Sequence, residues 1–443
     1  MTSKNVAQAE GILRFPLEEK QFVFSYKKVV IMKKTLAAVA VLGAFAGSAL
    51  AADVTLYGKV DLGLQYVNSN SDQIVSDGAE DPTYSIQNVK SDKMAVKSGS
   101  NSGSRWGIKG SEQISEGLTV GFQLENGFNA DNGKIAQNGG IFGRESRLYV
   151  QTDFGELAFG RMGGLESGSG SYDIISKGYG MSTGWGDSIG KTANIFLGQS
   201  DRFDNMITYK SPTFAGVTVY AQASLQKTSN EDEVEGSSDT DRYYALGATG
   251  NWGALSSALT FSTTDYSRTW VNAVDAKTGV ADKEAAKAEG REDMSKVVTG
   301  YVAYDFGMVK PMLSAQYFDD VKGVSWDMSD GLKDTLGETL GKYSKKGYGV
   351  MLGATAPLAG GTAYAMVGYN DFEATEDIQE FGGKAEFDTI NFGIGYQYPL
   401  SKRTYVYTAA GYTKLSGELK TEGEKFDADT KTTEVVAGIV HNF

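Results

Sequence analysis

Apolar and polar residues alternate one by one along much of this chain, and this alternation limits its possible folds more than any other feature. Between Val54 and Tyr66 one set of alternate residues is apolar, and the other is polar and partly charged. The same split recurs around residues 118–125, 309–317, 389–398 and 435–443. Side chains of a β-strand point alternately to opposite faces, so a period of two predicts strands with one apolar and one polar face.

The links between the expected strands alternate in length. Short links such as 115–117 and 153–155 are tight turns, whereas every second link, such as 67–103 or 162–202, is long and polar. In a soluble β-sandwich nothing requires the short links to lie at one end of the strands and the long links at the other. A transmembrane β-barrel has this arrangement, with short periplasmic turns and long outer loops. The pattern predicts sixteen strands, near residues 54–66, 104–114, 118–126, 144–152, 156–161, 203–210, 217–225, 242–249, 254–265, 297–305, 309–318, 347–356, 362–370, 385–398, 404–414 and 432–443.

A membrane explains why such strands would close into a ring. In lipid every backbone N–H and C=O must be paired internally, and tilted strands of about 9–11 residues cross the hydrocarbon layer. The 24 Tyr against 21 Phe suit aromatic girdles at the membrane surfaces. A ring of sixteen strands is too wide for side chains to fill, so its lumen holds water. The sequence therefore predicts an all-β fold, a 16-stranded antiparallel transmembrane β-barrel that forms a pore.

The N-terminal region carries export information. Met32-Lys33-Lys34 is a basic start, residues 36–50 are apolar and rich in Ala, and Ala49-Leu50-Ala51 is a small-residue cleavage site. This arrangement is typical of a secretory signal peptide. We expect three segments: residues 1–31 as an upstream extension that precedes the natural start, 32–51 as the signal peptide, and 52–443 as the barrel. The expected location is the cell outer membrane.

The composition argues against several function classes. The chain has no Cys and a single histidine, His441, which excludes paired-His and Cys-ligated metal sites and makes a Ser-His-Asp mechanism implausible. The formal net charge of −13 has the wrong sign for a nucleic-acid partner. Gly190-Lys191-Thr192 is similar to the end of a phosphate-binding loop, but Trp185 stands where its first Gly is needed. We expect no catalysis, no cofactor and no metal.

Five segments at strand ends resemble the Gram-negative general porins of the neisserial and betaproteobacterial type. They are DVTLYG at 53–58, SRWGIKGSE at 104–112, YKSPTFAG at 209–216, LSKRT at 400–404 and GIVHNF at 438–443. The resemblance implies a homotrimer that passes ions and small hydrophilic solutes. It also implies a third outer loop folded into the lumen opposite a basic wall. The terminal Phe443 resembles the signal read by the outer-membrane insertion machinery.

The phase of the strands tests which basic residues can form that wall. Most of the candidates share a strand face with polar residues, so they are expected to point inward. Arg161 is in phase with the apolar Leu157 and Phe159 instead, and a β-bulge at Gly160 would bring it inward. The predicted basic wall consists of Lys59, Arg105, Lys109, Arg147, Arg161 and Arg202.

The long link 162–202 contains ten glycines between Gly163 and Gly198, which suits tight folding inside a barrel. Its candidate acids facing the basic wall are Glu166, Asp173 and Asp187. The preference for anions or cations stays open, as do a substrate-specific channel and an adhesin role for the outer loops. The inward positions read as mostly small, Gly or charged, which disfavours an aromatic sugar track.

The sequence also makes predictions for two outer loops. The acidic loop 231–241 suggests solvation, or loose divalent-ion binding that bridges lipopolysaccharide phosphates. Residues 281–288 have helical composition and are expected to form one or two turns. Outer-membrane lipid and lipopolysaccharide are therefore the expected surroundings.

Overall fold

The computed structural model describes residues 53–76, 84–181, 185–227, 241–266, 294–322, 344–375, 383–420 and 425–443. The expected upstream extension and signal peptide, most of the acidic loop 231–241, and the expected helical turns at 281–288 lie outside these ranges. The chain divides into two units, Met1–Val54 and Thr55–Phe443. Apart from the first residues of β1, everything below concerns the second unit. No helix within the described ranges has the length and apolar character needed to span a membrane.

The described residues form seventeen strands and three short 3₁₀ helices. The helices are η1 (Gln137–Gly139), η2 (Ser176–Gly178) and η3 (Thr192–Asn194). The strands are β1 (Asp53–Ser76), β2 (Tyr84–Ser98), β3 (Arg105–Ser115), β4 (Leu118–Gly127), β5 (Glu145–Thr152), β6 (Gly155–Gly163), β7 (Arg202–Lys210), β8 (Val217–Ser224), β9 (Arg242–Trp252), β10 (Leu255–Asp265), β11 (Lys296–Tyr304), β12 (Lys310–Val321), β13 (Lys345–Leu358), β14 (Gly361–Ala374), β15 (Lys384–Pro399), β16 (Thr404–Lys420) and β17 (Lys425–Asn442).

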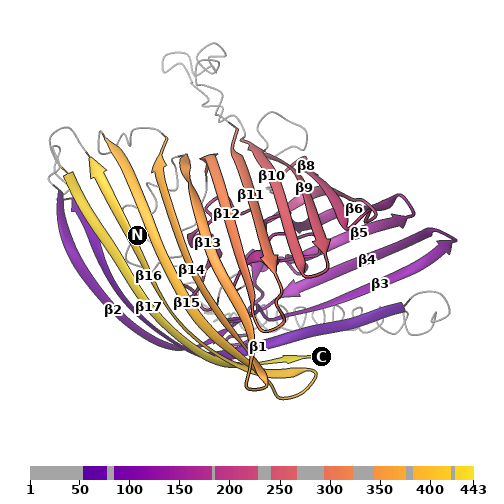
Figure 1. Cartoon of the computed structure of the whole chain (residues 1–443), viewed down its shortest axis with the longest axis horizontal. Coiled ribbons are helices and arrows are strands. Elements are labelled where there is room, and N and C mark those ends of the chain that lie inside the picture. The colour runs from indigo at the N-terminus through magenta and orange to yellow at the C-terminus, as the bar shows by residue number, and fades with distance from the viewer. Residues whose placement is uncertain are drawn as a thin grey trace, which may run out of the picture. The chain divides into compact units, whose positions relative to one another are not determined.

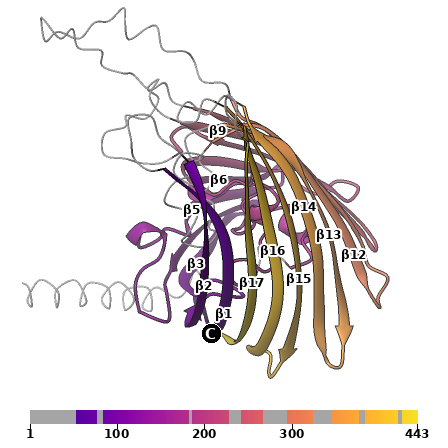
Figure 2. The same cartoon turned by 90° about the vertical axis from the view of Figure 1, so that its left-hand side faces the viewer.

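Sixteen of these strands, β1 and β3–β17, form a closed ring. From β3 to β17 each strand pairs with the next along the chain in antiparallel register. β1 closes the ring, because it pairs with β17 on one side, with Val60 opposite His441, and with β3 on the other. Figure 1 shows the long tilted strands β10–β17 side by side, and Figure 2 shows β1 beside β17. The predicted 16-stranded antiparallel β-barrel is confirmed.

β2 lies inside the link 67–103, where the sequence predicted a loop. It forms a hairpin with the outer half of β1, from Leu62 opposite Ser98 to Ser76 opposite Tyr84. Neither face of this strand is apolar throughout: Met94 and Val96 are exposed on one face, but the polar Lys90 and Asp92 precede them on that same face. The period-two pattern therefore gave no signal for it.

The two faces of the wall follow the predicted alternation. Side chains facing away from the lumen are large, apolar and exposed, such as Leu64 at 51 % and Leu352 at 55 %. Inward residues, such as Asp61 on β1 and Ser314 on β12, have no exposed surface. A soluble protein buries its apolar side chains, so an outer face of this kind is built to meet hydrocarbon.

Aromatic side chains on the outer face gather near both ends of the strands, as the Tyr content predicted. Near the long loops they include Tyr66, Tyr244, Tyr317, Tyr348 and Tyr369, and near the tight turns Tyr209, Trp252, Tyr304 and Tyr398. Rings of this kind favour the two membrane surfaces.

Candidate functional site

The link between β6 and β7, here called loop 164–201, packs against the inner face of the wall. Leu165 and Ile174 meet Gly247 of β9, and Ile189 meets Gly393 of β15 and Gly411 of β16. These wall glycines leave the room that the loop needs: a Cβ added at Gly393 would lie 2.9 Å from Ile189 Cγ2. The loop's apolar side chains form a buried core with the wall, which includes Leu165, Ile174, Ile175, Tyr179, Met181, Trp185, Ile189, Ile195 and Phe196.

The predicted glycine requirement of this loop holds at particular positions. Gly168, Gly170, Gly186 and Gly190 all have positive φ, a backbone region that residues with a Cβ rarely adopt. The loop therefore follows a path that few other sequences could take.

Polar wall residues hold the loop backbone in place. Ser314 of β12 donates to the Gly178 carbonyl at 2.7 Å, and Asn391 of β15 donates to the Ser188 carbonyl at 2.7 Å. Glu434 of β17 accepts the Asp187 and Ser188 N–H groups, the latter at 2.6 Å. Because these buried groups satisfy one another, the loop is fixed at several separate strands.

The three loop acids do not face the basic wall, contrary to the expectation from sequence. Glu166 is fully buried and accepts hydrogen bonds from Thr260 and Ser262 of β10. Burial raises the pKa of Glu166 to about 7, although these hydroxyl donors oppose the shift. Its carboxyl group anchors the loop instead of lining the lumen.

Asp173 and Asp187 are also engaged elsewhere. Asp173 accepts the Gly168 N–H at 3.2 Å and the Ser176 hydroxyl, both within the loop. Asp187 forms an ion pair with Lys97 of β2 and accepts a hydrogen bond from Gln65 at 2.8 Å. Sequence phase could not reveal these partners, because a loop has no fixed alternation of faces.

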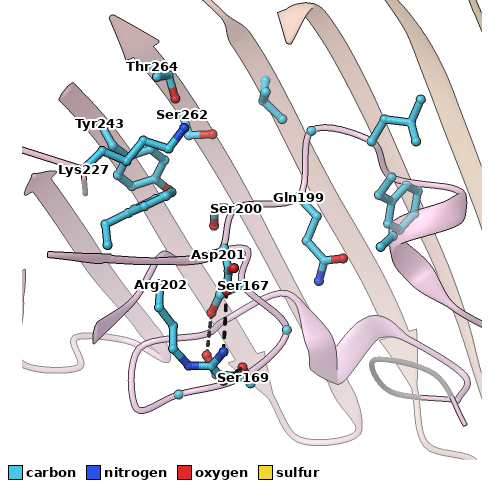
Figure 3. Close-up of a pocket in the computed structure, with 18 of the residues that line it drawn as sticks. Ser167, Ser169, Gln199, Ser200, Asp201, Arg202, Lys227, Tyr243, Ser262 and Thr264 are labelled. Atoms are coloured by element: carbon cyan, nitrogen blue, oxygen red, sulfur yellow. Dashed lines mark hydrogen bonds and ion pairs between the residues drawn. The ribbon is translucent and has the colours of Figure 1, made fainter. Parts of the chain in front are cut away.

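A cavity of about 720 Å³ lies between loop 164–201 and the wall near the outer ends of the strands. The described part of the chain contributes five basic side chains to it and one carboxylate, Asp201. Figure 3 shows Arg202 beside Ser169 and Asp201, with Lys227 across the cavity. The basic residues are Arg105, Arg144, Arg202, Lys227 and Lys322.

Three arginines line this cavity near two acids, Glu125 and Asp201. Glu125 of β4 accepts a charged hydrogen bond from Arg144 Nε at 2.6 Å and lies 3.8 Å from Arg105 Nη1. Arg202 donates to the Ser169 hydroxyl at 2.5 Å and lies 3.5 Å from Asp201. Glu125 and Asp201 are two carboxylates against three guanidinium groups, and Lys227 and Lys322 also line the cavity, so the cavity carries a positive potential.

Lys227 adds to this potential from the end of β8. Its ammonium lies 5.5 Å from the centre of the Phe203 ring and 5.8 Å from that of Tyr266. Burial lowers the pKa of Lys227, and the nearby Asp241 and Asp201 partly offset that effect.

Of the predicted basic wall, the cavity lining includes Arg105 and Arg202. Lys59 reaches its edge, because its ammonium donates to the Ser102 hydroxyl at 3.1 Å and Ser102 lines the cavity. The remaining three residues, Lys109, Arg147 and Arg161, do not line it.

Arg147 and Lys109 lie on the inner face but have other neighbours. Arg147 pairs with Glu145 at 2.8 Å and Glu156 at 3.5 Å, and donates to the Tyr172 hydroxyl. Lys109 lies 5.4 Å from the centre of the Tyr57 ring.

A β-bulge exists where the sequence required one for Arg161. The register between β6 and β7 shifts between Gly160 and Met162, and Gly160 has φ +125. Arg161 nevertheless pairs with Asp204 at 2.6 Å and donates to the Gly143 carbonyl at 2.8 Å.

Sequence reasoning missed several residues of the interior. The predicted strand 144–152 puts Arg144 in phase with the outward Leu148, but Arg144 lies one residue before β5 and contacts Glu125. Lys227 and Lys322 lie beyond the ends of β8 and β12, where phase gives no direction.

The inner wall also carries tyrosines. The phase of the strands places Tyr57 and Tyr149 on the inward face, and the structure confirms both. Sequence reasoning missed Tyr364, Tyr405 and Tyr407. Tyr364 shares its face with Thr362 and Asn370, which could have identified it, whereas Ala409 and Gly411 beside Tyr407 give no such signal.

Comparisons with known proteins agree with this architecture. Residues 37–418 match the Gram-negative porin family. An outer membrane porin protein of Bordetella pertussis is 30% identical over 437 residues, covering 93% of this chain and 100% of that protein. Outer membrane porin protein 32 of Delftia acidovorans is 28% identical, covering 86% and 90%. Among solved structures, an anion-selective porin from Comamonas acidovorans has a TM-score of 0.53 at 21% identity, covering 88% and 100%.

Proposed function

The chain belongs to the Gram-negative porin family, and we propose that its channel passes small anions more readily than cations. It is an outer-membrane porin that forms a water-filled channel for passive diffusion of ions and small hydrophilic solutes. One observation carries the anion preference: the cavity between loop 164–201 and the wall has five basic side chains and one carboxylate among its described lining residues.

Charged residues around a narrow passage set which ions enter it. The loop carboxylates that could have offset the arginines bind elsewhere, Glu166 at β10 and Asp187 at Lys97. The porin of Comamonas acidovorans is named as anion-selective, but at 21% identity it supports the fold alone. The preference proposed for this chain rests on its own side chains.

Loop 164–201 is proposed to form the narrowest part of the lumen. Support comes from its many contacts with β9–β17 and from the position of the cavity between loop and arginines. A loop fixed at several strands would narrow the pore permanently and bring passing ions close to Arg105 and Arg202.

The test replaces two cavity arginines, in the double variant Arg105→Gln/Arg202→Gln, and measures the reversal potential of single channels in a KCl gradient. We expect a shift toward cation preference, because two positive charges leave the lining. Lys420→Gln/Lys425→Gln is the matched control, since it also removes two positive charges, and both lysines pair with Glu418 and do not line the cavity. An equal shift in the control, or none in the double variant, would contradict the proposal.

The assembly of the protein is also proposed to follow the family pattern, as a homotrimer inserted by machinery that reads Phe443. Phe443 pairs with Gly58 of β1 through both backbone groups, at 3.1 Å and 3.0 Å, and its side chain is exposed. Deleting Phe443 should lower the amount of heat-modifiable oligomer in outer membranes, while Asn442→Ala should not. Unchanged amounts after the deletion would argue against this role.

A further inference from the structure

Asp61 of β1 is a carboxylate with no exposed surface, and it organises the segment that leads from β2 into β3. Its Oδ2 accepts the N–H groups of Asn101 at 2.8 Å and Ser102 at 2.7 Å. Its Oδ1 accepts the Tyr407 hydroxyl at 2.7 Å. Its backbone also takes part, because the Asp61 N–H donates to the Ser104 hydroxyl and the Asp61 carbonyl accepts the Gly99 N–H.

The segment held in this way, residues 99–104, supplies the acceptors for two basic side chains. Ser102 Oγ accepts from Arg105 Nη2 at 2.7 Å and from Lys59 Nζ at 3.1 Å. The Gly103 carbonyl accepts from Arg105 Nε at 2.9 Å. Thus the guanidinium of Arg105 is aimed by two consecutive residues of the segment.

Asp61 itself is not among the residues that line the cavity, whereas Asn101, Ser102, Gly103 and Arg105 are. We infer that Asp61 is a positioning residue for ion selectivity: it fixes residues 99–104, which orient Arg105 and Lys59 toward the ion path. This inference rests on the anion preference proposed above.

Removing the Asp61 carboxylate should change the anion preference in opposite directions, depending on whether Asp61 acts by its charge or by holding residues 99–104 in place. If Asp61 acted only through its negative charge, its neutralisation would make the lumen more positive and raise anion preference. If it acts by holding residues 99–104, its loss lets Arg105 and Lys59 move away and lowers anion preference. A charge that moves from about 4 Å to about 8 Å from an ion in water loses half its interaction, so anions lose and cations gain about twofold, and the permeability ratio falls about fivefold.

The experiment measures the anion-to-cation permeability ratio of Asp61→Asn, Ser102→Ala and the double variant in a KCl gradient. Each single variant should lower the ratio by up to about fivefold, since either one releases Arg105. The double variant should lower it no further than the more affected single variant, because both changes break one chain of contacts. A raised ratio in Asp61→Asn, an unchanged ratio in Ser102→Ala, or fully multiplicative effects would each overturn the inference.

A second variant covers the case in which Asp61→Asn fails to fold. Asp61→Glu keeps the charge but displaces the carboxylate by one methylene, so it should also lower the ratio, whereas an unchanged ratio would overturn the inference. Glu125→Gln separates the two claims. If Glu125→Gln and Arg105→Gln/Arg202→Gln both leave the permeability ratio unchanged, the proposed anion preference is wrong, and the positioning role is wrong with it. If these two variants change the ratio but the Asp61 and Ser102 variants do not, only the positioning role is wrong.

Discussion

Glu125 is the carboxylate closest to the cavity arginines, and neutralising it should make the channel more selective for anions. It lies 2.6 Å from Arg144 Nε and 3.8 Å from Arg105 Nη1, and it accepts the Tyr57 hydroxyl at 3.0 Å. Glu125→Gln keeps the size of the side chain and a carbonyl acceptor for Arg144, so the local geometry should persist. The change unmasks one positive charge.

The size of the effect follows from Coulomb's law. A unit charge about 8 Å from a passing ion in water contributes about 0.5 kcal/mol, which changes the local concentration of an ion about twofold. The local concentration of anions rises by this factor and that of cations falls by it, so the anion-to-cation ratio rises about fivefold before screening. The Debye length of about 10 Å at 0.1 M salt reduces this to roughly two- to threefold.

The assay is the reversal potential of the purified protein in planar bilayers with a KCl gradient at low ionic strength. Glu418→Gln is the control, because Glu418 on β16 pairs with Lys420 at 2.7 Å and Lys425 at 2.6 Å, away from the cavity. A permeability ratio that stays constant in Glu125→Gln, or that moves toward cations, would refute the electrostatic reasoning.

Two further predictions concern loop 164–201. Burial raises the folded-state pKa of Glu166 from 4.5 to about 7. Between these two pH values the folded protein binds more protons than the unfolded chain, so its stability falls as the pH rises. Glu166→Gln should therefore raise the thermal denaturation temperature at pH 8.5 but not at pH 4, and an equal gain at both pH values would contradict the burial argument. A Cβ at Gly353 would lie 2.5 Å from Gly180 Cα, so Gly353→Val should displace the loop and raise single-channel conductance, unlike Gly300→Val, whose nearest neighbour is the Leu259 side-chain end at 3.3 Å.

The wall of the barrel could be predicted from sequence because closure in lipid requires one apolar and one polar face on every strand. This requirement gave the sixteen strands of the ring and the inward direction of Glu125 and Arg147. It failed for β2, which pairs along the outer half of β1 and needs no apolar face there.

The contacts of the interior were harder to predict. The predicted strand 144–152 put Arg144 in phase with the outward Leu148. The observed strand β5 begins one residue later, so this phase does not apply to Arg144, and its position beside Glu125 was not predicted. The loop acids were predicted to face the basic wall only because they are negatively charged. In the structure, buried hydroxyl groups of β10 hold Glu166, and Lys97 of β2 holds Asp187. Side-chain partners that come from distant strands depend on the closed fold, which local patterns do not encode.

The most direct test of the central claim is the reversal potential of the unmodified channel in a KCl gradient. The excess of Arg and Lys over carboxylates in the cavity predicts a potential with the sign of chloride preference, and this preference should grow as salt is lowered because screening weakens. A potential with the sign of potassium preference at low salt would contradict the account.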